Sequence, residues 1–163
     1  MAIAAALSPL VMAQPPPPGG VIEGARHFYA VRVYYEDTDL SGITYHANYL
    51  RWFERARSDL LRMLGIDQRA QIEAGTEGGA YALSQVELKY LRPARLDDDV
   101  VIETVCTELG AASCRMDQIA RRGDEILCEA SLRVGFISLD GRPKRQPREW
   151  RAAFAQFMTE EDT

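Results

Sequence analysis

The sequence is poor in histidine and cysteine, which removes the usual ligands of metal sites. Its 163 residues contain two histidines, His27 and His46, and three cysteines, Cys106, Cys114 and Cys128, with no CxxC spacing. Zinc sites need three or four such ligands close together. We therefore expect no metal and no other cofactor, and we interpret the cysteines as reduced residues of the core.

The sequence also lacks an excess of positive charge and any long hydrophobic run. Lysine and arginine number 19 against 24 acidic residues, giving a net charge of −5 and a pI near 5.1. A chain of this charge has no general electrostatic match to nucleic acid. The apolar stretch near the N-terminus is interrupted by Pro9 and is too short to span a membrane. We expect a cytoplasmic protein with no nucleic-acid partner and no membrane span.

The N-terminal segment differs in composition from the rest of the chain. AIAAALSPLVMA resembles a secretory signal peptide in part, but no lysine or arginine precedes Arg26 to form its basic region. QPPPPGG then has the composition of a polyproline-like spacer. We predict a disordered Pro-rich extension over residues 1–24, in preference to a signal peptide, then one domain over 25–158 and a frayed tail over 159–163.

The remaining pattern is that of an α+β domain. Apolar residues recur every three or four positions between residues 49 and 64, which predicts an amphipathic helix with Asn48 as its N-cap. β-Branched and aromatic residues separated by short polar turns predict strands over residues 25–35, 80–91, 98–108, 112–121 and 125–138. A short terminal helix is expected over residues 146–158. One early helix followed by antiparallel strands is an α+β arrangement.

Acidic residues, a glycine and a histidine lie directly before the long helix, in YYEDTDLSGITYHANYLRWFERAR. A helix N-terminus offers free N–H groups that stabilise an oxyanion, and a nearby carboxylate can act as nucleophile or activate water. Taken alone, Asp37 and Asp39 would more often be capping, turn-forming or solvated acids.

This segment resembles the signature of hot-dog thioesterases of the 4-hydroxybenzoyl-CoA type. VELKYLRPARLDDDVVIET is similar to the same family, most closely to the Tol-Pal-associated acyl-CoA thioesterases of the YbgC group, and the likeness spans about residues 28–140. The resemblance implies a hot-dog fold, in which a five-stranded antiparallel sheet wraps around a long central helix. It also implies hydrolysis of an acyl-CoA thioester to a free acid and CoA.

The resemblance assigns roles to individual residues. Asp39 matches the catalytic carboxylate, acting as nucleophile, through an anhydride, or as the slightly favoured general base. His46 matches the residue whose backbone N–H binds the oxyanion, and its imidazole is either an ordinary hydrogen-bonding group or one that orients water or the acid. The residues expected to bind substrate are Gly42, Tyr45, Asn48 and Tyr49. For these, a turn glycine, a helix cap and a core aromatic are the plainer interpretations of Gly42, Asn48 and Tyr49.

The resemblance also implies partners. Family members are homodimers whose sheets join, or homotetramers, and their substrate is acyl-CoA or an acyl carrier protein thioester, here with a short-to-medium aliphatic or an aromatic acyl group. The basic cluster that binds CoA phosphates in aromatic-acyl members is absent from residues 109–113. Other cations are then the candidates: Lys89, Arg92, Arg95, Lys144 and Arg145. A non-catalytic acyl-binding or assembly module is the main alternative, and a hot-dog dehydratase is a weaker one.

Overall fold

The computed structural model describes residues 15–159 of the chain. Most of the predicted extension and tail, residues 1–14 and 160–163, therefore lie outside the described residues. Within the described range no helix is long and apolar enough to cross a membrane.

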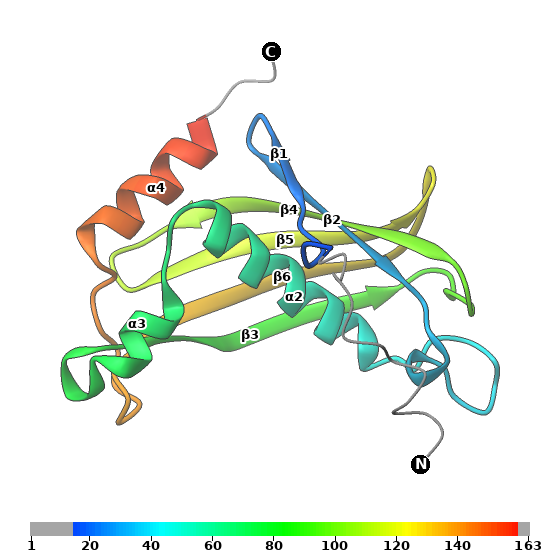
Figure 1. Ribbon diagram of the computed structural model, residues 1–163, viewed down its shortest axis with the longest axis horizontal. Coiled ribbons are helices and arrows are strands. Elements are labelled where there is room, and N and C mark those ends of the chain that lie inside the picture. The colour runs from blue at the N-terminus through cyan, green and yellow to red at the C-terminus, as the bar shows by residue number, and fades with distance from the viewer. Residues whose placement is uncertain (1–14, 160–163) are drawn as a thin grey trace, which may run out of the picture.

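The described residues form one antiparallel sheet in the order β1-β2-β4-β5-β6-β3 (Figure 1). The strands are β1 (Val21–Glu23), β2 (Arg26–Arg32), β3 (Ala80–Tyr90), β4 (Asp99–Leu109), β5 (Ser113–Arg122) and β6 (Glu125–Ile137). The segments β2 to β6 agree with the predicted strands to within a few residues. The three cysteines are free and buried in this sheet, as expected.

The sheet has one strand more than the five predicted. The additional strand is β1, which pairs with β2 across a turn at Gly24, where φ is +55°. This strand lies inside the range 1–24 that we expected to be disordered. A strand of three residues is too short for a period-two pattern to be recognised in the sequence, and it forms here because β2 offers a free edge.

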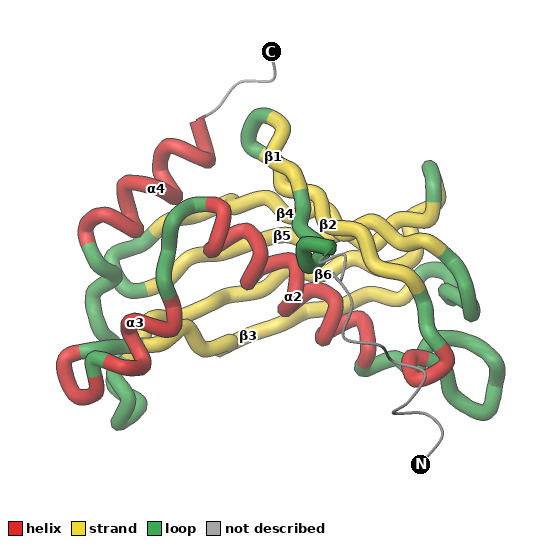
Figure 2. The backbone as a smooth tube through the Cα atoms, in the orientation of Figure 1, coloured by secondary structure: helices red, strands yellow, loops and turns green. Residues whose placement is uncertain are grey.

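The long helix α2 (Asn48–Met63) crosses the concave face of the sheet, as Figure 2 shows. It buries one broad face, which includes Trp52, Phe53, Ala56 and Leu60, each no more than 1% exposed. Burying one large apolar side chain stabilises a fold by about 1.5–3 kcal/mol. The central helix is therefore held mainly by its contacts with the sheet.

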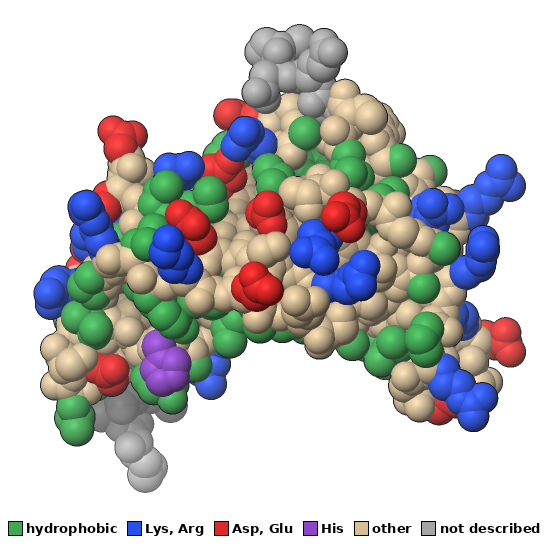
Figure 3. Space-filling view, turned by 180° about the vertical axis from the view of Figure 1, so that it is seen from behind, with side chains coloured by type: hydrophobic (Ala, Val, Ile, Leu, Met, Phe, Trp, Pro, Cys, Tyr) green, Lys and Arg blue, Asp and Glu red, His purple; other side chains and the backbone are tan. Residues whose placement is uncertain are grey.

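Two shorter α-helices and two 3-10 helices, η1 (Tyr35–Asp37) and η2 (Gly75–Glu77), complete the described part of the domain. The terminal helix α4 (Arg148–Thr159) was predicted. It buries Phe154 and Phe157 in the part of the core that contains the C-terminal half of α2. The connection from α2 to β3 contains α3 (Gln68–Glu73). The opposite face of the sheet carries interspersed acidic and basic side chains (Figure 3).

Candidate active site

A buried carboxylate anchors the loop that leads from β2 to α2. Asp37 is 6% exposed and accepts hydrogen bonds from the Tyr34 N–H at 2.8 Å and from the Asn48 side-chain amide at 2.7 Å. Its own backbone carbonyl accepts from the Tyr45 N–H at 2.7 Å. Both ends of the loop are thereby tied to the first turn of α2.

This arrangement corrects two expectations. Asn48 is not the N-cap of α2, because that position is taken by Ala47 and Asn48 points its amide back to Asp37. Asp37 is buried and not solvated, and its carboxylate caps the 3-10 turn Tyr35–Asp37 by accepting from the Tyr34 N–H, as the capping interpretation expected. The reason is tertiary: the loop folds back on itself and brings the two side chains together.

Between these anchors the loop closes as a narrow hairpin. The Asp39 N–H donates to the Ile43 carbonyl at 3.0 Å, and the Gly42 N–H donates to the Asp39 carbonyl at 3.0 Å. Gly42 has a φ of +78°, a conformation that residues with a Cβ adopt at a cost, and no protein atom lies within 4 Å of the position a Cβ would take. Gly42 is therefore required for the turn, and the space beside it is open.

The Asp39 carboxylate lies exposed at the tip of this hairpin. It accepts hydrogen bonds from the hydroxyl of Ser41 and from the Ser41 N–H, the latter at 2.8 Å. These bonds, with a smaller contribution from His46, hold the pKa of Asp39 below its ordinary value. The group is therefore ionised at neutral pH and available as a base or nucleophile. Sequence reasoning missed Ser41, although an Asp-x-Ser turn predicts such a bond.

The start of α2, seven to eight residues after Asp39 in the chain, offers open hydrogen-bond donors. The Asn48 N–H is bound to the Tyr45 carbonyl at 2.9 Å. Within residues 15–159, however, the His46 and Ala47 N–H groups have no acceptor in the protein. The resemblance named the first of these two N–H groups as an oxyanion donor, which stays a prediction, and it did not single out the second. Donors of this kind can stabilise negative charge that develops on a carbonyl oxygen.

Aromatic side chains surround the start of the helix. The Tyr45 ring is partly exposed and lies 4.4 Å from the His46 ring between centroids. Tyr49 is 2% exposed, and its hydroxyl accepts a hydrogen bond from the Ala94 N–H at 3.0 Å. Tyr49 is thus a core residue that ties α2 to the loop between β3 and β4, and burial raises its pKa.

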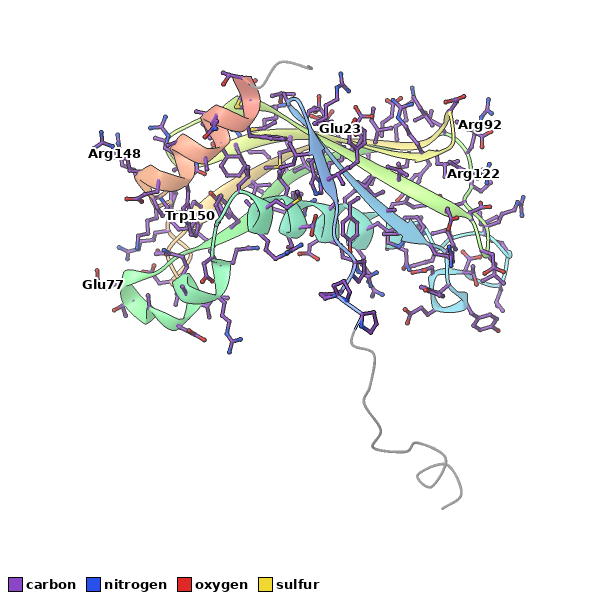
Figure 4. All side chains as sticks on the ribbon, turned by 45° about the horizontal axis from the view of Figure 1, so that its top comes forward. Glu23, Glu77, Arg92, Arg122, Arg148 and Trp150 are labelled. Carbon is purple, nitrogen blue, oxygen red and sulfur yellow. The ribbon has the colours of Figure 1, made fainter. Side chains whose placement is uncertain are left out.

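The structure separates the candidate phosphate-binding cations. Arg95 lies opposite Ile43 of the site hairpin in an isolated bridge. Arg92 pairs with Glu125 at 2.5 Å, and Figure 4 shows it near Arg122 at one end of the sheet, opposite the end that carries Arg148 and Trp150. Lys144 donates to the Gly78 carbonyl at 2.9 Å, which is a structural use of its ammonium group. Of these, Arg95 is the cation that the fold places beside Asp39's hairpin.

A helix wrapped by an antiparallel sheet, with an ionised carboxylate in the loop before the helix and open donors at the helix start, is the arrangement of hot-dog thioester hydrolases. The model of the thioesterase superfamily matches residues 41–129, and the chain belongs to this family. The predicted fold class and family are confirmed, although the sheet has an added strand.

Individual relatives agree with this assignment. The acyl-CoA thioesterase YbgC of Haemophilus influenzae is 37% identical over 77% of this chain and 92% of its own length. The acyl-CoA thioester hydrolase YbgC of Escherichia coli O6:H1 is 36% identical over 78% of this chain and 95% of its own length. The crystal structure of a probable thioesterase from Bartonella henselae, 35% identical, covers 75% of this chain and 99% of that one with a TM-score of 0.70. The protein is accordingly a thioester hydrolase, and nothing in these comparisons favours the non-catalytic alternative.

Proposed function

We propose that this protein hydrolyses acyl-CoA thioesters with Asp39 as its catalytic carboxylate. The observation that carries the proposal is the ionised Asp39 carboxylate, close enough to His46 for its pKa to be lowered by it, in the loop that leads to the open N–H groups of His46 and Ala47. The names of the two YbgC relatives support acyl-CoA as the substrate class.

The favoured mechanism uses Asp39 as a general base. Its carboxylate takes a proton from a water molecule, and the resulting hydroxide attacks the thioester carbonyl carbon. The oxyanion accepts hydrogen bonds from the His46 and Ala47 N–H groups. When the tetrahedral intermediate collapses, the C–S bond breaks and the sulfur receives the proton held by Asp39. The products are a carboxylic acid and free CoA.

Substrate contacts follow from the same surroundings. Tyr45 is the partly exposed aromatic beside His46, and the open space at Gly42 lets a substrate approach the backbone. Asn48 and Tyr49 are buried residues that support the site, Asn48 through its hydrogen bond to Asp37 and Tyr49 through its hydrogen bond with Ala94. Arg95 is the candidate contact for CoA phosphates because its neighbour in the bridge, Ile43, belongs to the hairpin. The acyl groups we expect are short-to-medium aliphatic or aromatic, on CoA or on a carrier protein.

We further propose a homodimer, or a homotetramer built from it, formed through β3. Within residues 15–159 this strand pairs with β6 on one side only, and its exposed side chains include Leu83, Val86 and Tyr90. A long apolar edge strand is a ready template for pairing with another chain. Pairing of β3 with its copy would continue the sheet and cover these side chains.

The buried free cysteines and the proposed CoA substrate favour a cytoplasmic location. A role alongside the Tol-Pal envelope system stays a prediction that depends on the resemblance to the YbgC group.

The test is release of free thiol from a panel of acyl-CoAs and an acyl carrier protein thioester. Asp39→Asn removes the carboxylate and keeps its size, so we expect it to lose most of the turnover while staying folded. Glu36→Gln, at an exposed acid in the same loop, should hydrolyse at the native rate. Full activity of Asp39→Asn would refute the assigned role, and an inactive native protein would revive the binding-module alternative.

A further inference from the structure

Tyr90, the last residue of β3, contacts the backbone of the site. Its hydroxyl donates a hydrogen bond to the His46 carbonyl at 2.6 Å. Its ring meets the rings of His46 and Tyr49 edge-on, at centroid distances of 6.4 and 5.5 Å. The Leu50 N–H binds the Ala47 carbonyl at 3.2 Å, so the helix itself supplies no donor to His46 from that position. The phenol of Tyr90 provides the missing hydrogen bond.

A β-bulge directs Tyr90 towards this carbonyl. Residues directly opposite in an antiparallel pair point to the same face of the sheet. Tyr81 lies opposite the buried Phe136 and Tyr90 opposite the buried Cys128, so both tyrosines face the helices. They are separated by an odd number of positions, and plain alternation would place them on opposite faces.

The irregularity that reverses this alternation lies at Ser84. Leu83 pairs with Val134 and Gln85 pairs with Arg133, which leaves Ser84 without a partner on β6. One additional residue shifts the alternation of every residue that follows it in the strand. Without this bulge the Tyr90 ring would lie on the outer face, away from His46.

The hydrogen bond to His46 acts on the adjoining N–H group. In a trans peptide the His46 carbonyl and the Ala47 N–H lie on one rigid plane and point in opposite directions. Fixing the carbonyl therefore fixes the direction of the Ala47 N–H. A hydrogen bond accepted by the carbonyl also polarises the peptide and strengthens its N–H as a donor.

We propose that Tyr90 is a positioning residue for the oxyanion donor, delivered to the site by the β-bulge at Ser84. This inference rests on the proposed function, in which the Ala47 N–H binds the oxyanion. Burial raises the pKa of Tyr90, with smaller contributions from Cys128 and Tyr45, so the phenol keeps its proton and donates throughout the neutral range. Tyr90 acts through the His46–Ala47 peptide and does not itself touch the reacting atoms.

The experiment compares two tyrosines of the same strand. Tyr90→Phe removes the hydroxyl from the site, whereas Tyr81→Phe removes a hydroxyl that donates to Gln146 at 2.6 Å at the other end of β3. We expect Tyr90→Phe to lower kcat about tenfold with KM unchanged. This is the effect of losing one hydrogen bond that stabilises the transition state and not the bound substrate. Tyr81→Phe should keep the native kcat.

A second readout does not depend on turnover. In the folded proteins, the backbone 13C resonance of the His46 carbonyl and the amide resonance of Ala47 should shift in Tyr90→Phe and stay in place in Tyr81→Phe. Unshifted resonances would show that the bond to His46 does not form.

The outcomes separate this inference from the proposed function. The role of Tyr90 is overturned, while the proposed function stands, if Tyr90→Phe keeps the native kcat or raises only KM. This comparison assumes that the native protein is active and that Asp39→Asn is not. An equal loss of kcat in both tyrosine variants would also overturn it, because the effect would be one of the strand as a whole. If the native protein hydrolyses no thioester, both proposals fall together.

Discussion

The side-chain amide of Asn48 donates a hydrogen bond to the carboxylate of Asp37 across 2.7 Å, and both groups are buried. This bond joins the first residue of α2 to the loop that carries Asp39 two positions further on. A buried polar pair of this kind fixes the geometry of the segments that it links, because leaving either group unpaired is costly.

Asn48→Ala should therefore weaken both the fold and the reaction. It deprives the buried Asp37 carboxylate of one donor, and we expect the free energy of unfolding to fall by about 1–3 kcal/mol. Because the loop loses an anchor, kcat should fall as well. Urea denaturation and thiol release measure the two effects. The control Gln156→Ala removes an exposed amide from α4, and a native-like Asn48→Ala would contradict the anchoring role.

The pH dependence of the reaction should depend on Ser41. In the proposed mechanism the active form of Asp39 is ionised, and its pKa lies below the ordinary value, so kcat/KM should fall only when the pH drops through that lowered pKa. Ser41→Ala removes the hydroxyl donor, raises the pKa of Asp39 and moves this acid limb to higher pH. Rates measured across the acid range test the direction of the shift.

Ser138→Ala is the matched control for this shift, because Ser138 also donates to a nearby aspartate, Asp140, in the loop after β6. Its acid limb should coincide with that of the native protein. An acid limb that stays in place in Ser41→Ala would exclude the Ser41 hydroxyl as a cause of the lowered pKa.

The buried Asp59 should make stability sensitive to acid. Burial alone would raise the pKa of Asp59, but hydrogen bonds from His27 at 2.8 Å and from Arg62 at 2.5 Å outweigh it and lower the pKa. The Gly20 N–H, at 2.8 Å, adds to this effect and ties the segment before β1 to α2. The ionised carboxylate therefore stabilises the folded state.

Asp59→Asn should remove this contribution. The native protein should exceed the variant by about 1–3 kcal/mol in free energy of unfolding near neutral pH. The folded-state pKa is the lower one, so the difference is complete above the unfolded-state value of about 3.9 and is lost as pH falls through the folded-state pKa. Denaturation at several pH values measures it, with the exposed Asp124→Asn as control. A difference that grows in acid would contradict the assignment.

The proposed dimer makes a prediction about the edge of β3. Val86 is 37% exposed on the face towards the helices, and Val86→Lys places a charge on the apolar face that pairing with a second β3 would cover. We expect the dimer to dissociate and turnover to fall. Size-exclusion chromatography with light scattering measures the mass. Gln85→Lys, one residue earlier on the outer face, should stay dimeric, and a dimeric Val86→Lys would argue against this edge as the interface.

Local patterns in the sequence were sufficient for the elements and for the family. The spacing of apolar residues predicted α2 because a helix that packs against a sheet must repeat its buried positions every three or four residues. The strands β2 to β6 were predicted because their composition suits a pleated, half-buried surface. The segment that joins Asp39 to His46 is continuous in the chain, so its resemblance to the thioesterases was visible without a structure.

Contacts between distant segments were decided by the tertiary structure alone. The pairing of Asp37 with Asn48 requires the loop to fold back. The contact of Tyr90 with His46 requires a bulge at Ser84, and the residues around this bulge are exposed, so the sequence there shows no clear hydrophobic alternation in which the shift could be recognised. The sequence by itself determined which class of enzyme this is and which carboxylate is its candidate catalyst. Only the folded chain decided what holds that carboxylate and its neighbouring donors in place, because hydrogen-bond geometry depends on how segments far apart in the chain pack together.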